Sequence, residues 1–158
     1  MKNIENINRS ISEMAIRLAS NTDLQTRLNI KQPLTIQDML TKHYICIGPQ
    51  TETNIEKSGR DVFLIVNLQD ITFYEEAINA RGVISIVADA NFNTTTTDYR
   101  DRLLDIVNEI VKSLDGAKLS SSITVSISGF SRVNYTELLT GYQIFFDFKD
   151  QGTKEVEL

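Results

Sequence analysis

The residue types that support nucleophilic catalysis come together at one place in the chain. His43 and Cys46 are a base and a thiol separated by three residues. In an extended segment this separation sends the two side chains to opposite faces, and no third group that would orient the histidine is evident. Glu75 and Glu76 are adjacent carboxylates, so they diverge in direction and have no basic partner nearby. We therefore expect a buried free thiol and a surface histidine, and the sequence predicts no catalytic residue and no enzyme.

Acidic residues recur at helical spacing in one segment, which raises the question of a metal site. Asp98, Asp101 and Asp105 would lie on one side of a helix, where carboxylates could bind a hard cation. Arg100 and Arg102 alternate with them and neutralise them locally, so an ion-paired, solvated face is favoured. The seven glycines are at least eleven residues apart, so no glycine-rich phosphate loop is present. The sequence predicts neither a metal nor a cofactor.

Composition excludes further classes of protein. The 158 residues are 41% hydrophobic and 23% charged, which is typical of a globular domain. The net charge of −5 argues against a protein that coats nucleic acid. The single cysteine excludes an internal disulfide, and the single histidine disfavours the usual zinc sites. The longest apolar run, Val62 to Val66, is far shorter than the roughly 20 residues that span a bilayer, so we expect no membrane association.

The first 43 residues are predicted to be helical. Ile4, Ile7, Ile11, Met14 and Leu18 follow one another at spacings of three and four, which places them on one stripe of a helix. This stripe needs a partner, which is either the chain's own sheet or a neighbouring subunit. A short helical turn over residues 23–28 and a helix over residues 36–42, capped by Thr35, are expected to follow.

The period then changes to that of strands, interrupted by one long helix. That helix should begin after a cap at Thr97, pair Glu109 with Lys112 on its solvated side, and end at Gly116. Residues 69–81 are expected to form a long connection with one turn of helix, and the polar segments Gly48–Arg60 and Gly129–Thr140 are expected to be projecting loops. The predicted strands cover residues 44–47, 62–68, 82–88, 122–128 and 141–148.

These elements define the expected fold class and domains. We predict an α+β fold, in which a mostly antiparallel sheet of four to five strands is packed by one long amphipathic helix and carries an N-terminal helical arm. The expected division is an arm over residues 1–43, an α/β core domain over 44–150 and a frayed tail over 151–158. The helix should contribute Leu103, Ile106, Ile110 and Leu114 to the core, facing Val62, Leu64, Ile84, Ile86, Ile123, Val125 and Phe146.

The order of these elements resembles that of a known family. The resemblance lies in GVISIVADANFN, a strand with a polar turn, in TDYRDRLLDIVNEIVKSLDG, a helix, and in SSITVSISGF and GYQIFFDFKD, two closing strands. Together with the N-terminal helix, this order is similar to that of the tail terminator (tail-completion) proteins of long-tailed bacteriophages, or of related neck proteins. The likeness covers roughly residues 44–149 and is one of pattern.

The resemblance implies a structural role in a virion, with the protein made in the host cytoplasm. Such a protein forms a ring, expected to be a hexamer, that terminates the tail tube and joins it to the head connector or neck protein. DNA would only pass through the lumen, which the acidic balance tolerates. The strands would border this lumen, and the two polar loops would reach adjacent subunits or the tail tube protein. The residues predicted at subunit or partner boundaries are Lys57, Arg60, Arg132, Asn134 and Tyr135.

A second function is compatible with the same residues. A small-molecule-binding or regulatory module of ferredoxin-like α/β type would have similar length and composition. Such a module needs a pocket with convergent polar groups, which depends on tertiary structure.

Overall fold

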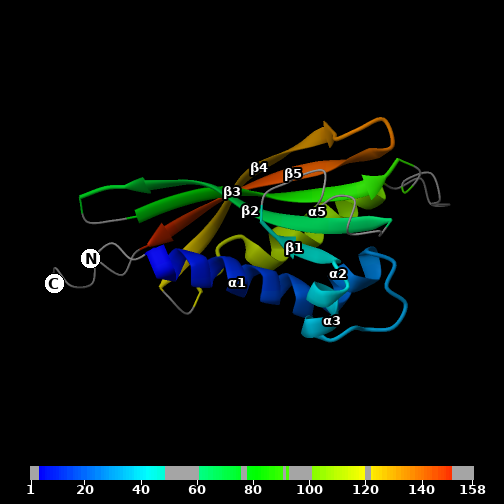
Figure 1. Ribbon diagram of the computed structural model, residues 1–158, viewed down its shortest axis with the longest axis horizontal. Helices are drawn as coiled ribbons and strands as arrows, with labels where there is room; N and C mark the ends of the chain where they lie inside the picture. The colour runs from blue at the N-terminus through cyan, green and yellow to red at the C-terminus, as the bar shows by residue number, and fades with distance from the viewer. Residues whose placement is uncertain are drawn as a thin grey trace.

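The computed structural model describes residues 4–48, 61–75, 78–90, 92, 101–119 and 122–150. A five-stranded, mostly antiparallel sheet carries the helices together on one of its sides (Figure 1). This arrangement confirms the predicted α+β fold and the N-terminal helix. The elements are α1 (Ile4–Ser20), α2 (Thr22–Arg27), α3 (Ile36–Thr41), β1 (Ile45–Ile47), β2 (Val62–Phe73), β3 (Ile78–Asp89), α5 (Arg102–Leu114), β4 (Ile123–Asn134) and β5 (Leu139–Asp150).

The sheet has the strand order β1-β2-β3-β5-β4. The short strand β1 pairs in parallel with β2, and every other neighbouring pair is antiparallel. The register of β2 shifts between Leu68 and Asp70, and that of β4 shifts between Ile127 and Gly129. Each shift is a bulge, which bends its strand and increases the local twist. The two hairpins, β2–β3 and β4–β5, have their turns at opposite ends of the sheet (Figure 1).

Two segments predicted as connections are in fact strands. Residues 69–73 continue β2, and Ile78–Arg81 begins β3, so most of the predicted connection is strand. Glu76 and Ala77, where the helical turn was expected, lie outside the described residues. The predicted projecting loop Gly129–Thr140 is likewise strand up to Asn134 and again from Leu139. Both predictions were wrong because pairing with a neighbouring strand satisfies the backbone polar groups of a polar segment, whatever its own propensity.

The N-terminal stripe packs on the chain's own sheet. Ile7, Ile11, Met14 and Leu18 are buried in the same hydrophobic cluster as the strands, whereas Ile4 is 55% exposed. The following short helices lie within one residue of the predicted ranges. Thr35 Oγ1 accepts a hydrogen bond from the Asp38 amide at 3.1 Å, which begins α3 as predicted.

The long helix α5 begins later than the predicted cap at Thr97. That residue lies outside the described residues, and the capping group is Asp101, whose Oδ1 accepts hydrogen bonds from the amides of Leu103 and Leu104 at 3.0 and 3.2 Å. The helix ends at Leu114, before Gly116 with its positive φ of 77°. Lys112 pairs with Glu109 at 3.7 Å, but Glu109 is only 7% exposed, so it does not lie on the solvated side as expected.

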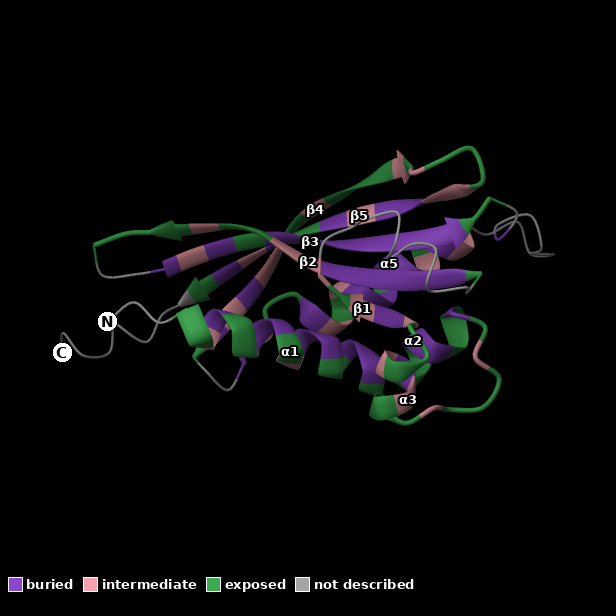
Figure 2. Ribbon diagram, viewed as in Figure 1, coloured by how far each residue is buried: buried purple, intermediate pink, exposed green. Residues whose placement is uncertain are grey.

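The main core lies between the sheet and the helices (Figure 2). The sequence predicted which side chains of α5 and of the strands face one another across this core. All of them are at most 2% exposed, and they belong to one cluster. A smaller cluster occupies the opposite face of the sheet, where Phe63, Ile65 and Val87 are buried. The sheet therefore buries apolar side chains on both faces near its centre.

Replacing Ile110 by Ala should destabilise the fold by about 2–5 kcal/mol, because the fully buried side chain leaves a cavity between α5 and the sheet. Urea unfolding followed by circular dichroism measures this change. Leu104→Ala on the same helix is the matched control, since Leu104 is 39% exposed, and it should cost far less. Equal losses for the two variants would contradict the assigned orientation of α5.

Candidate functional site

Within the part of the chain that the structure describes, no nucleophile–base contact joins the side chains of Cys46 and His43. His43 has a positive φ of 61° at the turn before β1, and the Cys46 thiol lies 3.9 Å from the carbonyl oxygen of His43. Cys46 is half-buried on the sheet face that carries Phe63 and Ile65, and this burial raises the pKa of its thiol. A raised pKa keeps the sulfur protonated near neutral pH and lowers its reactivity. His43 is exposed, as expected.

The carboxylates of α5 serve the fold. Asp101 caps the helix, and its Oδ2 accepts a hydrogen bond from the Tyr142 hydroxyl at 3.1 Å. Asp105 lies 3.7 Å from the guanidinium of Arg27 on α2, while Asp98 lies outside the described residues. In the part of the chain that the structure describes, no group of three or more His, Cys, Asp or Glu side chains could hold a metal ion.

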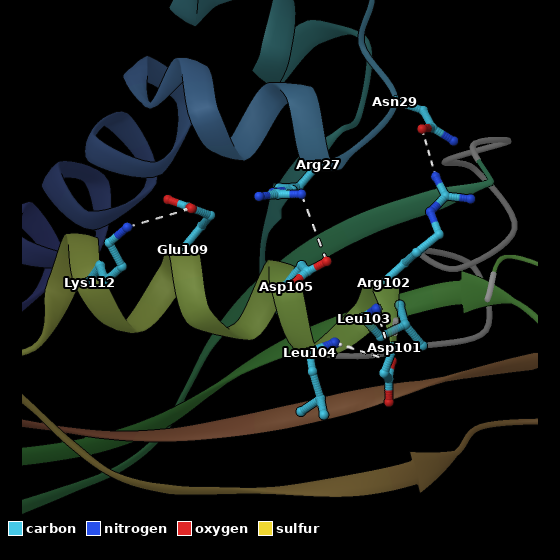
Figure 3. Close-up of polar contacts among 9 residues, drawn as sticks. All are labelled: Arg27, Asn29, Asp101, Arg102, Leu103, Leu104, Asp105, Glu109 and Lys112. Atoms are coloured by element: carbon cyan, nitrogen blue, oxygen red, sulfur yellow. Dashed lines mark hydrogen bonds and ion pairs between the residues drawn. The ribbon is translucent and has the colours of Figure 1, made fainter. Parts of the chain in front are cut away.

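Arg102 joins the first turn of α5 to two other segments (Figure 3). Its guanidinium donates a hydrogen bond to Asn29 Oδ1 at 2.6 Å and another to the carbonyl of Phe92 at 2.9 Å. The same group lies 3.9 Å from the centroid of the Phe92 ring, within the range of a cation–π contact. With the pair between Arg27 and Asp105, these contacts fix the beginning of α5 against the segment that follows α2.

The residues predicted at subunit boundaries have different environments. Lys57 and Arg60, with most of the first polar loop, lie outside the described residues. Arg132 is exposed on β4, with its guanidinium 6.0 Å from the Tyr142 ring centroid. Asn134 ends β4, and its Oδ1 accepts a hydrogen bond from Thr140 Oγ1 at 3.0 Å, which holds the hairpin together. The structure therefore places only the three residues of the β4–β5 hairpin, and these three make different contacts.

Tyr135 is held against its own sheet rather than projecting from it. Its hydroxyl donates to the Tyr142 carbonyl at 3.2 Å, and its side chain packs on the cluster of Phe63, Ile65 and Val87. Burial raises the pKa of its hydroxyl to about 12, while a hydrogen bond with Ser85 acts in the opposite direction. No local pattern in the sequence indicates this contact, because it depends on the turn of the β4–β5 hairpin.

A groove runs between α1 and the edge of the sheet formed by β1 and β2. Its volume is about 560 Å³, and most of its walls are apolar. Ile4 and Ile47 are 55% and 50% exposed at this groove, and Glu5 is its one charged lining residue among those described. The groove is lined by Ile4, Glu5, Ile7, Asn8, Ile11, Ile47, Gly48, Val66, Asn67, Leu68 and Ile71. The sequence signal for this groove was the apolar stripe of α1. This stripe extends beyond the part of the helix that the sheet covers.

A second depression, of about 480 Å³, lies beside the two bulges. It is more polar, with Asp70, Arg81 and Asp147 among its lining residues. Arg81 donates a hydrogen bond to Asp70 Oδ2 at 3.1 Å, and both side chains are largely exposed. Two of the three charges of this depression, Arg81 and Asp70, therefore pair with one another across β2 and β3.

Comparisons with known proteins identify no family: no protein-family model matches the chain, and no curated protein matches it. Among the described helices, none combines the length and the apolar character needed to cross a membrane.

Tyr135 should make the stability of the fold depend on pH in the alkaline range. Its folded pKa of about 12 exceeds the ordinary value of 10, so its contribution is complete below pH 10 and is lost as the pH rises towards 12. Urea unfolding at pH 9, 10 and 11 should therefore show a smaller loss of stability in Tyr135→Phe than in the unsubstituted protein. Exposed Tyr74→Phe is the control. A loss in Tyr135→Phe as steep as that of the unsubstituted protein would show that Tyr135 is not responsible.

Proposed function

We propose that this protein is a non-enzymatic structural subunit of a phage virion, which forms a ring that terminates the tail tube and joins it to the head connector. The observation that carries the proposal is the order of its elements: a long N-terminal helix, a short strand, two long strands, one amphipathic helix and two closing strands. This is the order by which the sequence resembles the tail terminator and related neck proteins.

The distribution of exposed apolar residues supports a role in assembly. Phe73 and Tyr74, at the end of the β2–β3 hairpin, are 50% and 52% exposed, and Leu138, at the end of the β4–β5 hairpin, is 74% exposed. Figure 2 shows the end of β2 and the turn of the β4–β5 hairpin as exposed, whereas β3 begins with the buried residues Ile78 and Ala80. Large apolar side chains grouped at an exposed site are typical of protein–protein contacts. Two such ends on one chain favour contacts with two neighbours.

The alternative, a small-molecule-binding ferredoxin-like module, has one observation in its favour. The depression at the bulges combines Asp70, Arg81 and Asp147 with a partly exposed Phe145. However, three strands precede α5 and two follow it, which differs from the β-α-β-β-α-β order of ferredoxin-like domains. We therefore favour the assembly role.

The proposal predicts a ring that binds to tail tubes. Light scattering after size-exclusion chromatography should give a species of about six times 17.9 kDa, alone or with tail tubes present. Electron microscopy of tubes, assembled from the tail tube protein encoded beside this chain, should show the added protein at one end only. A protein that stays monomeric in both conditions and leaves the tube ends bare would contradict the proposal.

A further inference from the structure

Among the described residues, each side of the sheet has an edge segment that pairs with no further strand. On one side, β1 pairs with β2 only at Leu64–Val66, and in the described ranges no strand lies along the outer side of Asn67–Thr72. On the other side, a bridge between Lys118 and Thr124 covers the beginning of β4. Beyond that bridge, the described residues include no strand outside Gly129–Asn134. Exposed strand edges of this kind are templates for pairing with another chain.

The directions of the strands make the two open edges compatible. Pairing is antiparallel from β2 to β3, from β3 to β5 and from β5 to β4, so β4 runs opposite to β2. A second copy placed beside the first, with its helices on the same side, therefore brings its β4 antiparallel to β2. Each open segment has six residues, which span about 20 Å of strand. Both segments are the C-terminal halves of their strands, and because β2 and β4 run in opposite directions, the segments lie at opposite ends of the sheet. The two copies are therefore staggered along the strand direction.

In the open segment of β4, Phe130 and Arg132 are on the face that carries the helices, as is Asn134 at the end of the strand. Phe130 is opposite Ile144 in the register and contacts the Tyr142 ring edge-to-face, with the ring centroids 5.8 Å apart. Arg132 is opposite Tyr142 itself. Ile144 and Tyr142 belong to the main core, which lies on the helix side. When β4 pairs with β2 of a second copy, these two side chains are on the same side as the groove between α1 and the sheet.

The groove and β4 are complementary in polarity and in charge. Phe130 is 48% exposed on β4, and Ile4 and Ile47 expose apolar surface at the groove. Arg132 is the one charged residue in the sequence of β4, and Glu5 is the one charged residue among the described groove walls. The two charges have opposite sign. Glu5 pairs with exposed Arg9 at 3.4 Å, a type of contact that contributes little and gives way easily.

We propose that the occupant of this groove is β4 of a second copy of the same chain. The open edge of β4 pairs with the open edge of β2, Phe130 enters the apolar groove, and Arg132 lies beside Glu5. This contact is heterologous, because one copy contributes β4 and the other contributes β2 and the groove. Heterologous contacts generate a closed ring when the rotation from one copy to the next adds up to a full turn. The inference rests on the proposed function for the ring, and it names the surfaces by which neighbouring subunits join.

Charge exchange between copies tests the contact. Glu5→Arg and Arg132→Glu should each weaken self-association about fivefold or more, because each places like charges together at the contact. An equimolar mixture of the two variants should restore association. In that mixture the groove altered by Glu5→Arg meets the strand altered by Arg132→Glu, and the unaltered groove of one variant meets the unaltered strand of the other. Sedimentation velocity over a concentration series measures both effects. Lys31→Glu, an exposed charge reversal outside the groove, should change nothing.

A second pair of variants tests the apolar part of the contact. Phe130→Ser should weaken association, whereas Phe145→Ser should not, because Phe145 is similarly exposed but lies on the opposite face of the adjacent strand. Circular dichroism and melting temperature confirm that each variant is folded before its association is measured. Equal effects of the two substitutions would overturn the assignment of this face.

The outcomes separate this inference from the proposed function. If the unsubstituted chain forms rings but the mixture of charge variants associates no better than either alone, pairing between β4 and β2 is wrong and the ring proposal stands. If the unsubstituted chain does not associate with itself at any concentration or on tail tubes, self-pairing is overturned. Binding of single subunits to the tube end then decides the proposed function separately.

Discussion

Strand β3 occupies the centre of the sheet and is paired along its length with β2 on one side and β5 on the other, so the position of every other strand follows from its register. Its side chains are buried on both faces from Val83 to Val87, and a shift of register by one residue would exchange the two sets. Gly82 marks a point of close approach to both neighbouring strands. A Cβ there would lie 2.5 Å from the Phe146 ring and 2.4 Å from the Asn67 carbonyl oxygen, so a larger residue would force the ring and the neighbouring strand apart. Pairing with β3 thus holds both hairpins in place.

One face of this sheet determines where the helices lie. The apolar stripes of α1 and α5 join the strands in one cluster, and polar contacts fix α5 in position from its first turn. Asp101 is central to those contacts because one carboxylate caps α5 and also accepts the hydrogen bond from Tyr142 on β5. On the opposite face, a small cluster with Tyr135 and Cys46 occupies the centre, and no described helix covers it. The described part of the fold therefore has a helix-covered face and a face made of strands alone.

The features that bear on assembly lie where this packing stops. Phe73, Tyr74 and Leu138 are exposed at the ends of the two hairpins. The strand β1 is only three residues long, so it leaves part of β2 open beside the groove. In the proposed ring, neighbouring subunits meet at these edges and ends. The charge of each open segment, Asp70 in one and Arg132 in the other, also prevents either edge from being uniformly apolar, which limits indiscriminate aggregation.

Local interactions made several elements predictable from the sequence. The spacing of Ile7, Ile11, Met14 and Leu18 identified α1, and Thr35 identified the start of α3. The apolar face from Leu103 to Leu114 identified α5 and its buried side. These features were predictable because helix periodicity and capping involve residues a few positions apart. Long-range pairing set the remaining features. Residues 69–73 and 129–134 are polar or irregular in pattern and became strands only because β3 and β5 offered them partners. The position of Tyr135 over the sheet, the burial of Glu109 and the groove beside α1 escaped prediction for the same reason, since each is formed by segments that only the folded sheet brings together.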